Sequence, residues 1–215
     1  MTENQPANPL TLLQLAGASP PRATLADSVL VIVDAQNEYV SGKLPLAGIA
    51  EAIAEGACLL AAARTVGTPV IHIVQHSAPG RPVFDPQTSF AEIVPQLTPL
   101  PAEEVIVKRL PNAFASTGLE AHLKAIAAAT GRKNIILAGF MTHMCISATA
   151  RAALDLGIAA TVVAAACATR NIPSLFGGVI AARMVHETAL AELADRFATV
   201  VANAAAISGA SASAA

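Results

Sequence analysis

Three residues with reactive side chains stand at or shortly after the ends of short apolar runs. They are Asp34, Lys108 and Cys145, and the runs that precede them cover residues 28–34, 105–108 and 134–138. In a sheet of parallel strands the carboxyl ends meet at one edge, where ligands bind. The sequence therefore predicts that a carboxylate, an ammonium group and a thiol share one site.

Cys145 has the most specific local sequence of the three. An apolar run is followed by Gly139, then by Thr142 and a helical pattern that continues to Leu156. Thr142 is suited to be the N-cap, which places Cys145 in the first turn of a helix. The helix dipole and the free N–H groups of a first turn favour a thiolate. We therefore expect Cys145 to be a nucleophile.

The three side chains together suit acyl transfer. A cysteine nucleophile needs a group that accepts its proton and donors for the oxyanion that develops on the substrate. Asp34 is a suitable base, and Lys108 can stabilise the thiolate and orient the carboxylate. The backbone N–H of Cys145, with one from the preceding turn, can hold the oxyanion. This chemistry forms a thioester, which water then hydrolyses.

The pattern between the ends of the chain alternates strands with helices. Strands are predicted at 28–34, 69–75, 105–108, 134–138, 158–164 and 197–201, and helices at 46–65, 119–129, 142–156 and 178–195. Unbroken apolar strands separated by helices indicate a parallel sheet covered on both faces, which is an α/β fold of three layers. We expect residues 28–202 to form one domain. Residues 1–27 should be an arm with little regular structure, and residues 203–215 a mobile tail.

Composition excludes several classes of protein. Hydrophobic residues make up 54% of the 215 residues, charged residues make up 13%, and the net charge of −2 includes no basic run, so no nucleic-acid partner is expected. Apolar stretches are too short to cross a membrane, and the N-terminus has no signal-peptide pattern. Three cysteines in no paired spacing favour a reducing, cytoplasmic location. Cys58 and Cys167 are expected to be packed thiols.

Three segments resemble a known family. They read Val-Ile-Val-Asp-Ala-Gln-Asn-Glu-Tyr (31–39), Val-Ile-Val-Lys-Arg-Leu-Pro-Asn-Ala-Phe-Ala-Ser-Thr-Gly-Leu (105–119) and Ala-Gly-Phe-Met-Thr-His-Met-Cys-Ile-Ser-Ala-Thr-Ala-Arg-Ala-Ala (138–153). Their order and spacing are similar to those of the isochorismatase-like cysteine hydrolase superfamily, which includes nicotinamidases and N-carbamoylsarcosine amidohydrolases. The similarity extends over about residues 25–202.

The resemblance has consequences for the fold and for the site. It implies a six-stranded parallel sheet in the Rossmann-like order 3-2-1-4-5-6. It implies a catalytic triad of Asp34, Lys108 and Cys145. It also implies a cis peptide bond between Phe140 and Met141, which would direct the N–H of Met141, together with that of Cys145, at the substrate oxygen.

Histidines give no support for a metal site. Nicotinamidases of this superfamily hold a metal with an Asp-x-His pair and a further histidine, and this chain lacks the pair. His72 and His76 are separated by about 13 Å if both lie on one strand, too far to share an ion. A catalytic Cys–His dyad is not expected either. His143 precedes Cys145 by two residues, and side chains two positions apart on a helix do not face each other. No metal is expected, and nicotinamide becomes a less favoured substrate. No Gly-x-Gly-x-x-Gly follows a strand, so no cofactor is expected either.

The sequence indicates the substrate less clearly than the type of reaction. Candidate pocket-lining residues are Gln36, Tyr39, His76, Phe114 and Phe140. The long loop 77–101 is either a lid or an interface, and the loop 171–178 is a second specificity candidate.

We predict a metal-independent cysteine hydrolase that cleaves an amide or ureido C–N bond of a small molecule. One alternative is cleavage of a vinyl ether, as in isochorismatases, which does not require the cysteine. The other is a binding or scaffold protein that has kept the fold without catalysis. The apolar composition and the alanine-rich helices predict a homo-oligomer, of two, four or more subunits.

Overall fold

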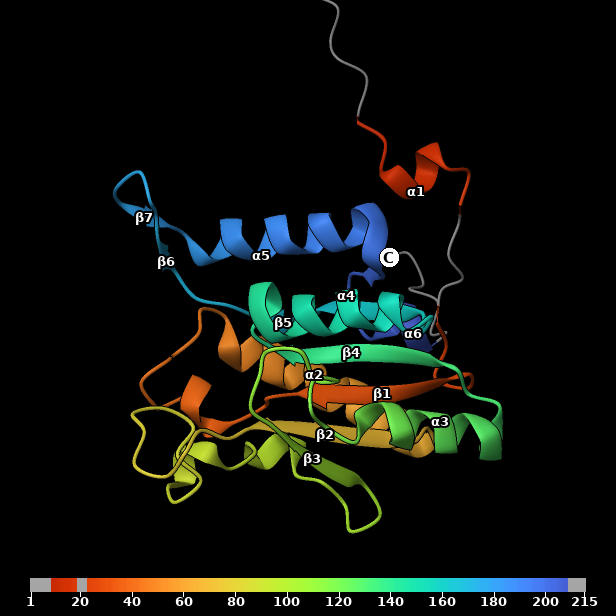
Figure 1. The fold of residues 1–215 in the computed structure, drawn as a ribbon, viewed down its shortest axis with the longest axis horizontal. Helices are drawn as coiled ribbons and strands as arrows, with labels where there is room; N and C mark the ends of the chain where they lie inside the picture. The colour runs from red at the N-terminus through yellow and green to blue at the C-terminus, as the bar shows by residue number, and fades with distance from the viewer. Residues whose placement is uncertain (1–8, 19–22, 209–215) are drawn as a thin grey trace, which may run out of the picture.

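A computed structural model of the chain describes residues 9–18 and 23–208, which form three layers around a central sheet (Figure 1). The strands of the sheet are β1 (Ser28–Val33), β2 (Val70–Gln75), β3 (Glu104–Lys108), β4 (Asn134–Phe140), β5 (Ala160–Ala168) and β8 (Thr199–Val201). They are all parallel and lie in the order β3-β2-β1-β4-β5-β8. The predicted order 3-2-1-4-5-6 is confirmed, because β8 is the sixth strand of this sheet.

Helices cover both faces of the sheet. They are α1 (Leu12–Leu15), α2 (Ile49–Thr65), α3 (Leu119–Thr130), α4 (Ser147–Asp155), α5 (Ala182–Glu192) and α6 (Ala205–Ser208). Shorter turns are the 3-10 turns η1 (Asn37–Tyr39), η2 (Ser89–Ala91) and η3 (Pro95–Leu97), and the π-helical turns η4 (Thr142–Ile146) and η5 (Leu193–Phe197). No helix among the described residues has the length and apolar character that crossing a bilayer needs.

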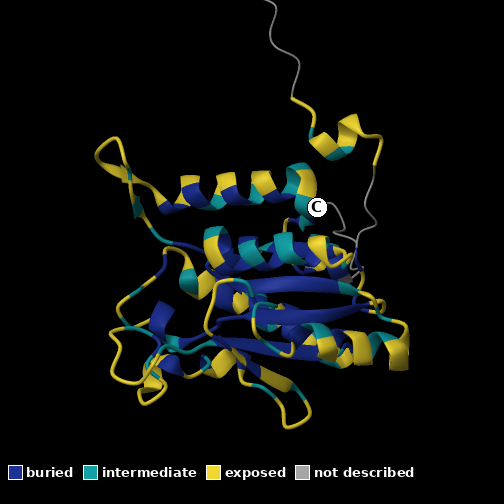
Figure 2. Ribbon diagram, in the orientation of Figure 1, coloured by how far each residue is buried: buried dark blue, intermediate teal, exposed yellow. Residues whose placement is uncertain are grey.

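The structure has two hydrophobic cores, one on each face of the sheet, and alternate side chains of β1 contribute to each of them. Leu30 and Ile32 pack with side chains of α2 and α6, whereas Val29 and Val31 pack with side chains of α3 and α4. Successive side chains of a strand point to opposite faces, so a strand in the middle of a covered sheet must be apolar at every position. The inner strands are accordingly buried along most of their length (Figure 2), whereas the edge strand β3 exposes Glu104, Val105 and Val107.

The predicted helix 178–195 is wrong at its beginning. A small antiparallel hairpin, β6 (Ile172–Pro173) with β7 (Val179–Ile180), precedes α5, and this hairpin extends away from the body of the molecule in Figure 1. The two glycines at 177 and 178 have positive φ angles of 92° and 77°, which suit a turn and not a helix start. This hairpin leaves no periodic pattern in the sequence, because both of its strands are only two residues long.

The flanking segments are more regular than predicted. The arm contains α1, which begins with a capping box between Thr11 and Gln14, and the N–H of Leu12 donates to Asp195 Oδ1 at 2.8 Å. At the other end Ala204 and Ile207 are buried, so the beginning of the predicted tail packs against the core. Residues 1–8, 19–22 and 209–215 lie outside the described residues.

Gly139 is required where β4 passes β1. Its φ is +116°, and a Cβ atom built on it would lie 2.0 Å from the carbonyl oxygen of Val33. The two strands pair at this level, Val33 with Gly139, one residue before Asp34. The close approach therefore fixes the end of β1 against the segment that leads to Cys145.

A Gly139→Ala substitution should destabilise the protein by more than about 3 kcal/mol, because the added methyl group must displace a strand of the core. Thermal unfolding followed by circular dichroism measures the loss. The matched control is Gly118→Ala, where φ is −85° and the nearest atom to the new Cβ, in His122, is 3.4 Å away. That substitution should change stability by less than about 1 kcal/mol. Equal losses in the two variants would contradict the role given to Gly139.

Candidate active site

The structure brings Asp34, Lys108 and Cys145 together at the carboxyl edge of the sheet. Asp34 follows the last residue of β1, Lys108 is the last residue of β3, and Cys145 lies in η4, the turn that follows β4. Lys108 Nζ is 2.7 Å from Asp34 Oδ2 and 3.3 Å from Cys145 Sγ. Asp34 and Lys108 are at most 1% exposed, and Cys145 is 5% exposed.

A fourth side chain completes the surroundings of the ammonium group. Gln75 Oε1 accepts from Lys108 Nζ at 2.7 Å, so the three N–H donors of the lysine face a carboxylate, a sulfur and an amide oxygen. Gln75 ends β2 and pairs in register with Lys108. Gln75 was not among the site residues predicted from the sequence. The signal was its position at the carboxyl end of a strand, which is the same signal that singled out Asp34 and Lys108.

The turn that carries Cys145 is not the helix start that the sequence predicted. Met141 is its N-cap, and η4 makes one π-helical turn before α4 begins at Ser147. Thr142 does not cap this turn: its hydroxyl donates to the carbonyl of Ala168 at 3.1 Å and is 2.9 Å from His186 Nδ1. Thr142 thus ties the nucleophile turn to β5 and to α5. The peptide bond between Phe140 and Met141 is cis.

Electrostatics make Cys145 a resting thiol, contrary to the predicted thiolate. Burial, and then the negative charge of Asp34, raise the pKa of Cys145 to about 12, although Lys108 opposes the shift. Burial also raises the pKa of Asp34 despite the charge of Lys108. The Cys145 thiol and the Asp34 carboxylate both contact Lys108 Nζ, and each shifts the pKa of the other. The carboxylate is therefore a stronger base than a solvated one, and it shares the contact with Lys108 Nζ with the thiol whose proton it would remove.

Two of the candidate pocket residues pack near this group. Tyr39 meets Phe140 edge to face at a centroid distance of 5.9 Å, and it meets Phe84 in the same way at 5.3 Å. Burial raises the pKa of the Tyr39 hydroxyl, and the charge of Asp34, together with that of Cys145 when it is a thiolate, raises it further. This hydroxyl therefore lies within electrostatic reach of the reacting groups. Phe84, in the loop 77–101, is an aromatic neighbour that the sequence did not single out.

Gln36 has a structural role and is not a pocket residue. Its Nε2 donates to the carbonyls of Gln75 and Ala91 at 3.0 and 2.7 Å, and its Oε1 accepts from the N–H of Gln75 at 2.8 Å. The side chain is fully buried, so none of its polar atoms is free for a substrate. Gln36 instead ties the end of β1 to the end of β2 and to the loop 77–101.

The remaining candidates are less close to the triad. His76 lines a cavity of about 470 Å³ together with Pro86, Val105 and other residues, but no triad residue lines that cavity. Phe114 packs against the core cluster that contains Cys145. His143 does not pair with Cys145, because its Nδ1 is 2.6 Å from the hydroxyl of Thr169.

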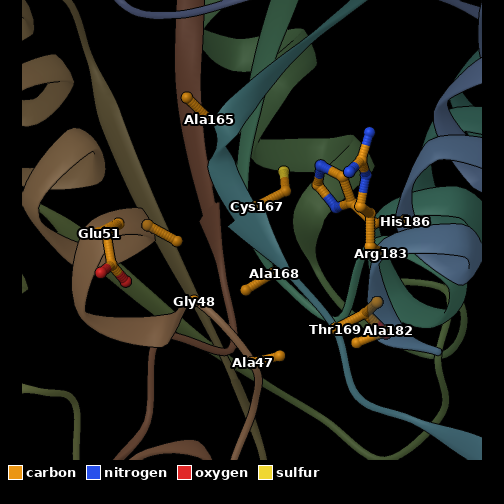
Figure 3. A pocket seen from close by; sticks show the side chains of 11 residues that line it. Ala47, Gly48, Glu51, Ala165, Cys167, Ala168, Thr169, Ala182, Arg183 and His186 are labelled. Carbon is orange, nitrogen blue, oxygen red and sulfur yellow. The ribbon is translucent and has the colours of Figure 1, made fainter.

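Another hollow lies beside the carboxyl end of β5. It has a volume of about 400 Å³ and is formed by the beginnings of α2 and α5 and by the last part of β5. Figure 3 shows Glu51 on its α2 side, and Cys167 and His186 on its β5 and α5 sides. Cys167 is buried as predicted, but Cys58 is exposed, contrary to the expectation that it packs. Within the described parts of the chain, no three His, Cys, Asp or Glu side chains are grouped to hold a metal ion.

Comparisons with known proteins agree with this fold. The family model described as the isochorismatase domain matches residues 28–205. The "Secreted isochorismatase effector Isc1" of Verticillium dahliae is 40% identical over 187 residues, which cover 87% of this chain and 94% of that protein. The crystal structure of an isochorismatase from Pseudomonas putida KT2440 is 42% identical, with a TM-score of 0.86 over 93% of this chain and 99% of that one. A more distant relative, the "Ureidoacrylate amidohydrolase RutB" of Pseudomonas syringae, is 27% identical over 81% of this chain and 87% of its own length.

An Asp34→Asn substitution should lower the pKa of Cys145. The amide removes the negative charge beside the thiol, while Lys108 continues to stabilise a thiolate. We expect a fall of at least about one pH unit, which corresponds to about 1.4 kcal/mol. Thiolate absorbance at 240 nm, measured against pH in a Cys58→Ser background, reports the midpoint. A midpoint that stays at the value of the unsubstituted triad would show that Asp34 does not control the thiol.

Proposed function

Because the chain belongs to the isochorismatase family, we propose that it is a cysteine hydrolase that cleaves an amide or ureido C–N bond in a small molecule. One observation carries the proposal: a buried ammonium group, Lys108 Nζ, lies 2.7 Å from the carboxylate of Asp34 and 3.3 Å from the thiol of Cys145. A thiol beside a base is the arrangement that nucleophilic catalysis by cysteine needs. A vinyl-ether hydrolysis that does not use the cysteine would not explain why a thiol lies beside a base at this site.

The first half of the reaction acylates Cys145. Asp34 accepts the thiol proton as Sγ attacks the carbonyl carbon, so the negative charge passes from the carboxylate to the substrate oxygen. Lys108 stays positively charged and stabilises whichever group is the anion. The backbone N–H groups of Met141 and Cys145 donate to the oxyanion. Collapse of the tetrahedral intermediate breaks the C–N bond, and the protonated Asp34 gives its proton to the departing nitrogen.

The second half releases the acid. Asp34, again a carboxylate, accepts a proton from a water molecule that attacks the thioester carbon. The C–S bond breaks and the thiolate takes back the proton, which restores the resting thiol. The high pKa of Cys145, about 12, supports this sequence, because the cysteine is reactive only while Asp34 takes its proton. No metal takes part in the proposed reaction, in keeping with the missing Asp-x-His pair.

Replacing the nucleophile should stop this hydrolysis. Cys145→Ala should lower kcat by at least about a thousandfold on any amide or ureido compound that the wild type turns over, because no thioester can form. Ammonia or amine release from a panel of small amides and ureido compounds measures it. Unchanged turnover in Cys145→Ala would contradict the mechanism. Failure of the wild type to turn over any of the panel would favour the scaffold alternative.

A second candidate activity is hydrolysis of isochorismate, which the names of the two most similar relatives above favour. The variant Cys145→Ser separates the two candidates. If the chain is an isochorismatase whose reaction does not use the thiol, turnover of isochorismate persists in Cys145→Ser. The amidohydrolase proposal expects little isochorismate turnover in the wild type and a loss of amide turnover in the variant.

We also propose that the protein associates with copies of itself. The hairpin β6–β7 and the start of α5 expose Leu175 (98%), Phe176 (100%), Val179 (68%) and Met184 (61%). These residues form an apolar edge that a monomer would leave in water. The hairpin stands clear of the body of the molecule, so it can reach a neighbouring subunit (Figure 1).

Sedimentation equilibrium should give a mass of at least two chains for the wild type. A double substitution, Leu175→Ser with Phe176→Ser, should shift the distribution towards the monomer, because it removes apolar area from the contact and leaves the core unchanged. The control is Val66→Ser, which replaces an apolar residue that is 53% exposed on another part of the molecule. A wild type that remains monomeric up to high concentration would contradict the proposal.

A further inference from the structure

Glu38 carries a buried carboxylate that has no cation beside it. The residue is 2% exposed, and no Lys, Arg or His side chain of the described residues lies within 4 Å of its oxygens. A charge that is removed from water is costly unless it is paired or hydrogen-bonded. The reaction proposed above does not use this carboxylate, so its burial needs a different explanation.

The two oxygens of Glu38 accept backbone N–H groups from two separate segments. Oε1 accepts from the N–H of Lys43 at 2.6 Å, and Oε2 accepts from the N–H of Phe84 at 3.2 Å. A Cβ atom built on Gly42 would lie 2.6 Å from Oε1, so the chain turns tightly around the carboxylate. Only an ionised carboxyl accepts at both oxygens, because an amide or a protonated acid has a donor at one of them. Glu38 therefore joins the turn after η1 to the loop 77–101.

Phe84 is the residue that this contact holds in the loop. Its φ is +54°, a left-handed conformation that is uncommon for any residue except glycine. Such a conformation persists only where the surroundings fix it. Here the carboxylate of Glu38 fixes the N–H of Phe84, and its carbonyl accepts from the N–H of Ser77 at 2.9 Å. The phenyl ring of Phe84 is thereby held against the ring of Tyr39.

A row of three rings leads from Phe84 to the nucleophile turn. Tyr39 meets Phe84 at a centroid distance of 5.3 Å and Phe140 at 5.9 Å, and all three residues are buried. Phe140 ends β4, and the next residue, Met141, is the N-cap of the turn that carries Cys145. The N–H of Met141 is one of the two proposed oxyanion donors. Close-packed interiors transmit strain, so a displaced ring in this row would displace that donor.

We propose that Glu38 is a positioning residue for the reaction at Cys145. Its carboxylate fixes Phe84 against Tyr39, and the row of three rings then fixes the N–H of Met141 where the oxyanion develops. This inference rests on the proposed function for the oxyanion step. Loss of the carboxylate should slow acyl transfer more than it changes the reactivity of the thiol.

Two reagents separate acyl transfer from thiol reactivity. With p-nitrophenyl acetate, Sγ of Cys145 bonds to the carbonyl carbon, an oxyanion develops, and the C–O bond to p-nitrophenolate breaks. With iodoacetamide, Sγ displaces iodide and no oxyanion forms. The thiol proton passes to Asp34 in both reactions. The measured quantity is the ratio of the acylation rate to the alkylation rate at Cys145 in a Cys58→Ser background, with the labelled cysteine assigned by peptide mass spectrometry.

Glu38→Gln should lower this ratio at least about fivefold, which is part of the roughly hundredfold loss that removal of one oxyanion donor causes. A changed thiol pKa or a generally loosened site would move both rates together and leave the ratio unchanged. The matched control is Glu55→Gln on α2, because Glu55 also accepts a backbone N–H, that of Ala204 at 2.6 Å. The control should keep the wild-type ratio. A wild-type ratio in Glu38→Gln, or an equal fall in both variants, would overturn the proposal.

Phe84→Leu tests the route from Glu38 to the turn. It should lower the ratio by a similar factor, and the double variant should fall no further than the larger single loss, because both changes interrupt one row of contacts. Losses that multiply in the double variant would contradict this route. The same variant decides the case in which Glu38→Gln does not fold: Phe84→Leu must then lower the ratio, and an unchanged ratio overturns the proposal.

A further measurement decides the case in which Cys145 resists both reagents. That result counts against the proposed nucleophile but leaves the role of Glu38 to be measured directly. In protein that contains methyl-labelled methionine, Glu38→Gln should shift the nuclear magnetic resonance signal of the Met141 methyl group, and Glu55→Gln should not. A Met141 signal at the same position in Glu38→Gln and in the wild type would overturn the proposal.

Discussion

The buried ammonium group of Lys108 is the contact on which the arrangement of the site depends. A charge that is removed from water is costly unless it is paired and hydrogen-bonded, and removing one partner of a buried pair leaves the other uncompensated. Lys108 has all three partners: Asp34, Cys145 and Gln75. Each comes from a different strand end or turn. The ammonium group therefore holds the ends of β1, β2 and β3 and the turn after β4 in one geometry.

The rest of the fold can be understood as support for this contact. Parallel strands bring their carboxyl ends to one edge, and the close approach of Gly139 to Val33 fixes two of those ends against each other. Gln36 joins the same edge to the loop 77–101 by three hydrogen bonds. Thr142 and Thr169 secure the nucleophile turn and the β5 end from the other side. A rigid framework of this kind lets an anionic charge move between oxygen and sulfur without rearrangement of the protein.

The sequence was sufficient to predict the sheet order and the meeting of the three reactive residues. Strand periodicity and strand-end position are local properties, and the resemblance supplied the order. It was not sufficient to predict the protonation state of Cys145, because the effect of burial and of a neighbouring carboxylate outweighs the dipole of a helix start, and neither is readable locally. The pocket role expected of Gln36 differs from its observed contacts for a similar reason. A polar residue after a strand can bind a ligand or hold a loop, and only the tertiary contacts show which of the two it does. The hairpin β6–β7 was too short to give a periodic pattern.

The central claim is that Cys145 carries the acyl group during turnover. Intact-protein mass spectrometry of the enzyme, quenched in acid while it turns over an amide or ureido compound, tests that claim most directly. We expect a population whose mass is increased by the acyl part of the substrate, located on Cys145 by peptide mapping and removed by hydroxylamine. Steady turnover with no adduct on Cys145 at any quench time, by an enzyme that the Cys145→Ala variant matches in rate, would contradict it.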